Sequence, residues 1–268
     1  MKSKFSIIIF ISVLNFVFSQ QNLKDTLKYE IIYNLSYQEN KEDTINIKSE
    51  EMVLKISKKF SYFISNNNLK LKNMLSEFKK TNEAPKIQSV PKSKFRYIIV
   101  KDYGKNEINF TDKIGLDVYD FTQSLKLNWT LYDEETEILG YKCKKATTSF
   151  AGRNYIAWYS TEIGISDGPY KFQGLPGLIF SIYDTKNQYK FNAITIKKDN
   201  TYLDLNDEYN NHIKITEKEY KELKRMYREK PTSMLNSNFS FSKEDLEKLE
   251  SKAKEKFKYE NNPLELED

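Results

Sequence analysis

Residues 164–179 have the sequence Gly-Ile-Ser-Asp-Gly-Pro-Tyr-Lys-Phe-Gln-Gly-Leu-Pro-Gly-Leu-Ile. Four of the chain's 8 glycines and two of its 6 prolines fall within residues 164–177. Glycine permits positive φ and close backbone approach, whereas proline fixes φ at about −65°. The side chains between them are too apolar for an ordinary solvated loop: Tyr170, Phe172, Leu175 and Leu178. We therefore expect a rigid, doubly turned connection that folds back on a sheet.

Two turns are expected in this segment. Residues Asp167-Gly168-Pro169 form one turn signal, and Leu175-Pro176-Gly177 form the other. The second suits a type II turn, in which proline occupies position i+1 and glycine position i+2.

Two interpretations of the segment stay open. In the structural one, Gly174, Pro176 and Gly177 form a tight corner before a strand that begins at Leu178. In the functional one, the loop forms the rim of an apolar cleft that receives a ligand, since aromatic-lined concavities on curved sheets suit lipids or peptides. The residues of that candidate ligand site are Trp158, Tyr170, Phe172, Leu175 and Pro176.

The sequence on both sides of the loop is typical of β-strands. Apolar residues alternate with polar ones over Tyr29–Tyr37, which predicts a half-buried strand. Further strands are predicted at Met52–Ile56, Phe60–Ile64, Arg96–Lys101, Glu107–Phe110, Gly140–Phe150, Asn154–Ser160, Leu178–Asp184 and Tyr189–Lys197. Short turns between them favour an antiparallel arrangement. The fold class we expect is mainly β, a large curved antiparallel sheet or partly closed barrel with a few peripheral helices.

Helical spacing marks three other stretches. Apolar residues recur every three or four positions within residues 69–80, which predicts a short amphipathic helix. Thr216 is a candidate N-cap of a second helix that Pro231 ends, and Ser242 with Asp245 resembles a capping box that opens a third. The predicted division is a β domain over residues 20–230 and a C-terminal linker with an amphipathic helix over residues 231–268.

The N-terminal residues predict export. Lys2 and Lys4 precede the apolar run Phe5–Phe18, and Ser19 offers a cleavage point. We expect residues 1–19 to be a cleavable signal peptide, the mature chain to lack a transmembrane segment, and the protein to be periplasmic or secreted. No cysteine follows the run to carry a lipid anchor.

The loop also carries a family resemblance. Gly174–Ile179 reproduces the hexapeptide after which the GLPGLI family of Bacteroidota envelope proteins is named, and Tyr141–Phe150, Ala157–Tyr159 and Ser166–Phe172 are similar to that family's central block. The similarity covers roughly residues 137–197. The resemblance implies a secreted or periplasmic protein without an established activity, and it supplies no catalytic residues.

Composition excludes several classes of function. Of 43 cationic residues only 4 are Arg, and the Lys residues are interspersed with Asp and Glu, which indicates a solvated surface and no nucleic-acid partner. With 1 His and 1 Cys, we expect no His-rich metal site, no disulfide framework and no cofactor. His212 is the one imidazole available as a base, and no nucleophile elbow is present.

These observations favour a non-enzymatic envelope protein that binds an apolar ligand or another envelope component near the Gly/Pro segment. A lipid, a peptide and an envelope protein all remain possible partners. One alternative is a hydrolase that uses Asp167 or Cys143, although an alternating strand makes Cys143 a candidate for the core. Another is a structural or assembly protein whose C-terminal helices make the contacts.

Overall fold

The computed structural model describes residues 23–81, 90–206, 212–235 and 242–266 of the 268-residue chain. The predicted signal peptide lies outside the described residues. The strands are β1 (Lys24–Gln38), β2 (Ile47–Ser57), β3 (Phe60–Ser65), β4 (Ile98–Asp102), β5 (Glu107–Ile114), β6 (Asp117–Gln123), β7 (Thr130–Ile138), β8 (Tyr141–Phe150), β9 (Arg153–Ser160), β10 (Leu178–Asp184), β11 (Tyr189–Lys198), β12 (Tyr202–Asp204) and β13 (Ile213–Lys214). The helices are α1 (Asn66–Thr81), α2 (Glu217–Glu229), the 3₁₀ turn η3 (Pro231–Met234) and α3 (Lys243–Tyr259).

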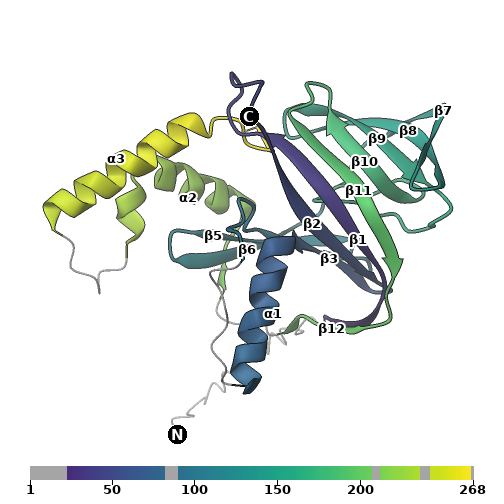
Figure 1. Cartoon of the computed structure of the whole chain (residues 1–268), viewed down its shortest axis with the longest axis horizontal. Helices are drawn as coiled ribbons and strands as arrows, with labels where there is room; N and C mark the ends of the chain where they lie inside the picture. Colours follow the sequence, from purple (N-terminus) through teal and green to yellow (C-terminus); the bar gives the residue numbers. More distant parts are fainter. Residues whose placement is uncertain (1–22, 82–89, 207–211, 236–241, 267–268) are drawn as a thin grey trace, which may run out of the picture.

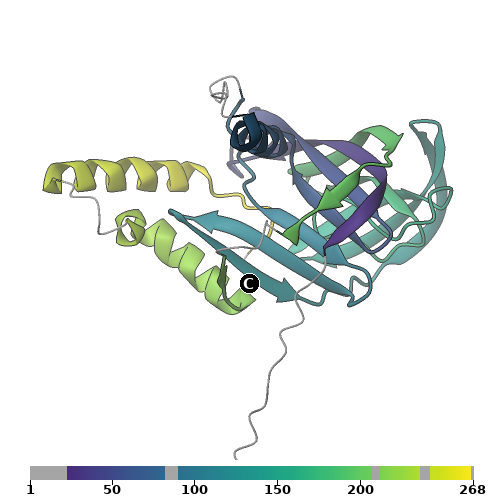
Figure 2. The same cartoon turned by 90° about the horizontal axis from the view of Figure 1, so that it is seen from below.

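These strands form one 13-stranded sheet (Figure 1). Its order is β13-β6-β5-β4-β3-β2-β1-β11-β10-β9-β8-β7, with β12 beside β1. Neighbouring strands pair antiparallel, except for the two-residue parallel contact of β13 with β6. Within the described residues the path ends at β13 and β7 without joining, so the sheet is curved but open (Figure 2). The predicted mainly β, antiparallel fold is confirmed.

The alternation in the first strand sets its two faces. Ile31, Tyr33 and Leu35 are fully buried, and Tyr37 is nearly so, while the residues between them are partly exposed. Since successive side chains in a strand point to opposite faces, one face of β1 packs into the core. This strand pairs with both β2 and β11 and so joins the two arms of the sheet.

The Gly/Pro loop, residues 164–177, fills the space between these arms. Tyr170 packs against Tyr97, which leads into β4, with ring centroids 5.2 Å apart. Phe172 packs against Tyr155 of β9 at 4.7 Å. The loop therefore contacts both arms and belongs to the same apolar core. The expectation of a loop folded back on a bent sheet is confirmed.

The backbone of the loop differs in detail from the predicted turns. Gly174 adopts a φ of 99°, but Gly177 does not have a positive φ, so the expected type II turn at residues 175–177 is wrong. Glycine is required at 177 for space, because an added Cβ would lie 2.1 Å from the carbonyl oxygen of Ser160. The first turn is closed by Phe172 N–H, which donates to Pro169 O at 3.1 Å, with Tyr170 in the left-handed region at a φ of 54°.

The predicted helices are present, and four strands were not predicted. The helix expected at 69–80 is α1, and Thr216 caps α2 through a capping box with Glu219. The unpredicted strands are β6, β7, β12 and β13. Strand β7 is exposed over almost its whole length. A strand with no buried face needs no alternation of apolar and polar residues, so its sequence carries no strand signal.

Residues 260–266, which follow α3, return to the sheet beside β1 (Figure 1). Asn262 and Leu264 are 4% and 7% exposed. Arg153 of β9 donates to Asn262 Oδ1 at 2.7 Å and to Leu264 O at 3.0 Å. This part of the predicted linker-and-helix segment is therefore integral to the packed structure.

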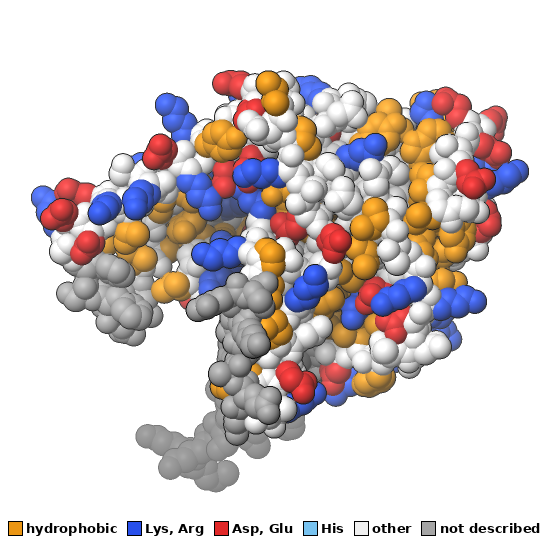
Figure 3. All heavy atoms as spheres, viewed as in Figure 1, with side chains coloured by type: hydrophobic (Ala, Val, Ile, Leu, Met, Phe, Trp, Pro, Cys, Tyr) orange, Lys and Arg blue, Asp and Glu red, His pale blue; other side chains and the backbone are white. Residues whose placement is uncertain are grey.

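The surface carries interspersed charges. Figure 3 shows Lys and Arg side chains mixed with Asp and Glu over the face that it presents, with scattered apolar side chains between them.

Replacing Gly177 with Ala tests the steric requirement at the corner of the loop. The new methyl group collides with the main chain at Ser160, and we expect a loss of about 3 kcal/mol in unfolding free energy. The midpoint of thermal unfolding should fall by roughly 6–12 °C. Gly164→Ala is the matched control, because a Cβ there meets nothing within 4 Å. Equal stability of the two variants would contradict the assignment.

Candidate functional site

Lys101, on β4, and Asp167, in the Gly/Pro loop, form an ion pair shielded from solvent. Their side chains are 1% and 0% exposed, and Lys101 Nζ lies 2.5 Å from Asp167 Oδ1. Lys101 Nζ also donates to the carbonyl oxygens of Gly168 (2.7 Å) and Phe172 (3.1 Å), so all three of its donors are used. Asp167 Oδ2 accepts from the Tyr103 hydroxyl at 2.5 Å. Because breaking a buried pair leaves an uncompensated charge, these bonds fix the loop to β4.

Burial governs the protonation of the groups around this pair. It lowers the pKa of Lys101 below its ordinary value, against the attraction of Asp167. Burial also raises the pKa of Tyr103 well above its ordinary value, reinforced by the negative charge of Asp167. The Tyr103 hydroxyl therefore keeps its proton and remains a donor. Asp167 is enclosed by these partners, so the geometry presents no accessible carboxylate there for hydrolysis.

The apolar residues proposed for a ligand site are mostly core residues. Tyr170, Phe172 and Leu175 are 4%, 0% and 1% exposed, and their neighbours are other core side chains. Trp158 is half-buried and packs against the same core, and Pro176 is exposed. The prediction that these residues line an open cleft is thus corrected, because the hollow of the curved sheet is filled by the loop itself.

Cys143 and His212 do not form a catalytic pair with Asp167. Cys143 is fully buried, and burial together with the nearby Glu162 carboxylate raises the pKa of its thiol to about 12. His212 lies beside β6, with Nδ1 3.8 Å from Asp120 Oδ1. Among the residues that the structure covers, no cluster of three or more His, Cys, Asp or Glu side chains is arranged to hold a metal ion.

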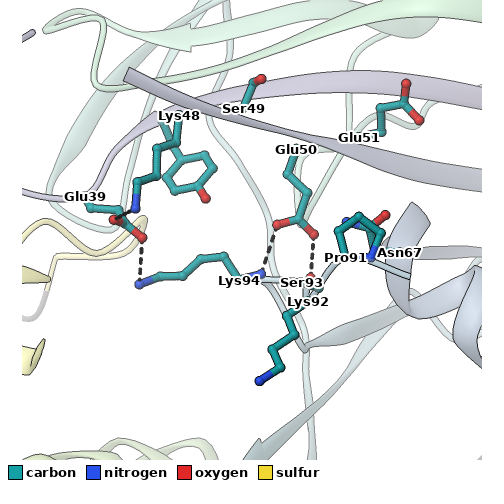
Figure 4. A pocket seen from close by; sticks show the side chains of 11 residues that line it. Glu39, Lys48, Ser49, Glu50, Glu51, Asn67, Pro91, Lys92, Ser93 and Lys94 are labelled. Carbon is teal, nitrogen blue, oxygen red and sulfur yellow. Dashed lines mark hydrogen bonds and ion pairs between the residues drawn. The ribbon is translucent and has the colours of Figure 1, made fainter. Parts of the chain in front are cut away.

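An open cleft lies at the end of the β1–β2 hairpin, beside the start of α1. Its volume is about 550 Å³, and Figure 4 shows the side chains that line it. They come from four stretches of chain: the end of β1, the start of β2, the first turn of α1, and the segment before β4. The charged members are Glu39, Lys48, Glu50, Glu51, Lys92 and Lys94.

Glu50 is held rigidly at the floor of this cleft. It is 9% exposed, and its Oε1 accepts from the Ser65 hydroxyl at 2.5 Å and from the Ser93 hydroxyl. Its Oε2 accepts from the Lys94 main-chain N–H at 3.0 Å (Figure 4). The hydrogen bonds of Glu50 therefore tie the segment before β4 to strands β2 and β3.

Glu39 forms the second fixed carboxylate. It pairs with Lys48 and, at 3.1 Å, with Lys94. Burial acts to raise the pKa of Glu39, but the bonds and charges of the two lysines outweigh it and lower that pKa. Burial, followed by the charges of Glu39, Glu50 and Glu260, raises the pKa of Tyr37 to about 12. The cleft thus presents fixed charges of both signs at neutral pH.

Sequence reasoning missed this cleft for a definable reason. Its residues lie on four separate segments and match no spacing motif, so only the folded chain brings them together. A weak signal was available, because Glu50 and Glu51 stand at the polar start of an otherwise apolar strand.

Comparison with known proteins extends this description. Residues 151–181 match the model of the Porph_ging family. Its members are described as proteins of unknown function. The match covers β9, the Gly/Pro loop and the start of β10, so the resemblance to GLPGLI proteins is confirmed over this segment. No curated protein matches the chain.

Solved structures of PNGF-II in space groups P21 and C2 share the fold. Each has a TM-score of 0.54, with 20% and 19% sequence identity. The alignments cover 76% and 75% of this chain but 34% and 33% of theirs, so the chain spans about a third of the PNGF-II length. Likeness at this identity concerns the fold alone. In the described part of the chain, no helix combines the length and apolarity needed to cross a bilayer.

Cys143 lies on β8, the strand that pairs with β9, and its reactivity can be tested directly. A thiol with a pKa of about 12 is thiolate in roughly one molecule in ten thousand at pH 8. We expect the native protein to resist 5,5′-dithiobis(2-nitrobenzoic acid) at pH 8 for an hour and to react fully in denaturant. Lys144→Cys, on the exposed face of the same strand, should label within minutes. Rapid labelling of the native wild-type thiol would revive the hydrolase interpretation.

Proposed function

We propose that this protein is a non-enzymatic binding protein of the cell envelope that contacts another envelope protein at the cleft of Glu39 and Glu50. The observation that carries the proposal is the cleft itself, which is open and has two carboxylates fixed by surrounding donors. Fixed charges cost little to organise on binding, which favours recognition over flexible surface contacts.

The chemistry of the cleft favours a polypeptide over an apolar ligand. Its lining is charged and hydroxyl-rich, and the apolar side chains of the Gly/Pro loop are occupied by core packing. Lysines and carboxylates lie side by side there, which complements a polypeptide carrying charges of both signs. Lys92 is exposed at the rim and available to a partner's carboxylate.

Export forms part of the proposal. The basic residues, apolar run and small residue within residues 1–19 support passage through a membrane, followed by cleavage of that segment. The protein would then act in the periplasm or outside the cell. The resemblance to Bacteroidota envelope proteins supports the same compartment.

Site-specific photo-crosslinking tests the cleft as a contact surface. A photoreactive phenylalanine at Asn67, on the cleft wall, should give a discrete crosslinked protein in cells, and the same group at Lys144 on β8 should give none. Lys92→Glu should lower the yield about fivefold, as expected for loss of one rim charge worth about 1 kcal/mol.

Lys113→Glu is the matched charge reversal on an exposed position of β5. It should leave the crosslink unchanged. Equal crosslinking from Asn67 and Lys144, or an equal effect of the two charge reversals, would contradict the proposal.

A further inference from the structure

The chain's own C-terminal segment, Asn262–Leu266, occupies a built receptor on the sheet. The receptor side chains, which we call the tail cradle, are Arg153, Tyr155, Tyr170, Lys171 and Tyr189. They come from β9, the Gly/Pro loop and the start of β11, so they lie outside the open cleft described above.

Every polar group of Asn262, in its main chain and its side chain, forms a hydrogen bond. Its main-chain N–H donates to Glu39 O at 3.1 Å, and its side-chain amide donates to Gln38 O at 2.7 Å. Its Oδ1 accepts from Arg153 at 2.7 Å, and its carbonyl oxygen accepts from the Tyr189 hydroxyl at 2.5 Å. A residue of another type would leave buried partners without hydrogen bonds, which costs stability.

Arg153 directs most of its donors to the tail. Its Nε donates to Leu264 O at 3.0 Å, and its NH2 nitrogen donates to Pro263 O and to Asn262 Oδ1, both at 2.7 Å. The NH1 nitrogen is held by Asp184 at 3.0 Å. The sheet therefore orients the planar guanidinium, and its remaining N–H groups face the peptide segment.

Lys171 supplies the second recognition point. Its side chain is 2% exposed, and its Nζ lies 2.6 Å from Glu265 Oε1 and 4.7 Å from the centre of the Phe110 ring. The Tyr170 hydroxyl donates to the same carboxylate oxygen at 2.7 Å. Burial lowers the pKa of Lys171, and the Glu265 charge opposes that shift. Without the Glu265 carboxylate, this buried cation would lose its ion-pair partner.

Part of the cradle is also held by residues outside the tail. The Asp184 carboxylate that orients Arg153 is itself fixed by the N–H groups of Gln188 and Tyr189, both at 2.7 Å. Lys171 belongs to the loop that Lys101 anchors. The tail is the end of the described chain and contributes no strand, so its departure breaks no sheet pairing.

We propose that the tail cradle is a peptide-binding site that accepts, from a partner protein, an extended segment with the pattern Asn-x-apolar-acidic, in which x is any residue that supplies its main-chain carbonyl. The chain's own Asn262-Pro263-Leu264-Glu265 occupies it when the partner is absent. The ligand class follows from the contacts: a side-chain amide for Arg153, consecutive main-chain carbonyls for its guanidinium, an apolar side chain like that of the buried Leu264, and a carboxylate for Lys171. None of the cradle side chains lines the open cleft, and the proposal does not rest on the function proposed for that cleft.

Fluorescence anisotropy with a synthetic peptide tests the cradle in the full chain. The probe is a labelled, amidated peptide of residues 259–266, and the receptor is the full chain carrying Asn262→Ala and Glu265→Ala, which loosens its own tail. We expect the peptide to bind this variant at least tenfold more tightly than wild type, where the linked tail competes at high effective concentration. Adding Lys171→Met, or changing the glutamate of the peptide to glutamine, should weaken binding at least tenfold. Affinity that ignores both changes would overturn the proposal.

A second measurement uses the wild-type chain, in case the loosened variant does not fold. Leu266 N–H donates to Ala151 O at 3.1 Å, and Asn262 N–H is bonded as above, so both should exchange slowly with deuterium. Millimolar peptide should raise exchange at these two amides by replacing the tail, and a scrambled peptide should not. Unchanged exchange with the matching peptide would overturn the proposal. Pairing of two chains by mutual tail exchange, detected as a peptide-sensitive dimer, would also overturn it by making a second copy the occupant.

Discussion

The buried contact between Lys101 and Asp167 fixes the Gly/Pro loop to the sheet. A curved, open sheet leaves a hollow between its arms, and here a loop fills it in place of a helix. Loops bring unpaired main-chain groups, which are costly to bury. Lys101 offsets that cost by bonding two loop carbonyls as well as the Asp167 carboxylate. Lys101 thus supplies hydrogen bonds to loop carbonyl groups that burial would otherwise separate from water.

The tail cradle depends on this arrangement, and the open cleft is its neighbour. The tail cradle takes Tyr170 and Lys171 directly from the anchored loop, and so inherits its rigidity. The open cleft lies beside the tail, because Lys94 pairs with both Glu39 and Glu260. The large apolar side chains of the loop are buried, so the two surfaces that we propose for binding lie around the loop.

The sheet and the loop were predictable from local sequence, whereas the cradle was not. Alternation over Tyr29–Tyr37 identified the central strand, and crowded glycines and prolines identified a rigid loop. The exposure of the loop's apolar side chains was not predictable, because such side chains suit a core and a ligand site equally. Asn262 carries no periodic signal, and its bond to Arg153 spans 109 residues, so only the folded sheet brings the two together.

Native-state hydrogen exchange of the loop tests the central claim most directly. The Ile179 N–H donates to Asp167 O at 2.9 Å, and the Phe172 N–H donates to Pro169 O at 3.1 Å. If the buried lysine makes the loop part of the core, both amides should exchange only through global unfolding, with the same opening free energy as amides of β9 and β10. Exchange at these two amides through local opening, while the neighbouring strands stay protected, would contradict the account.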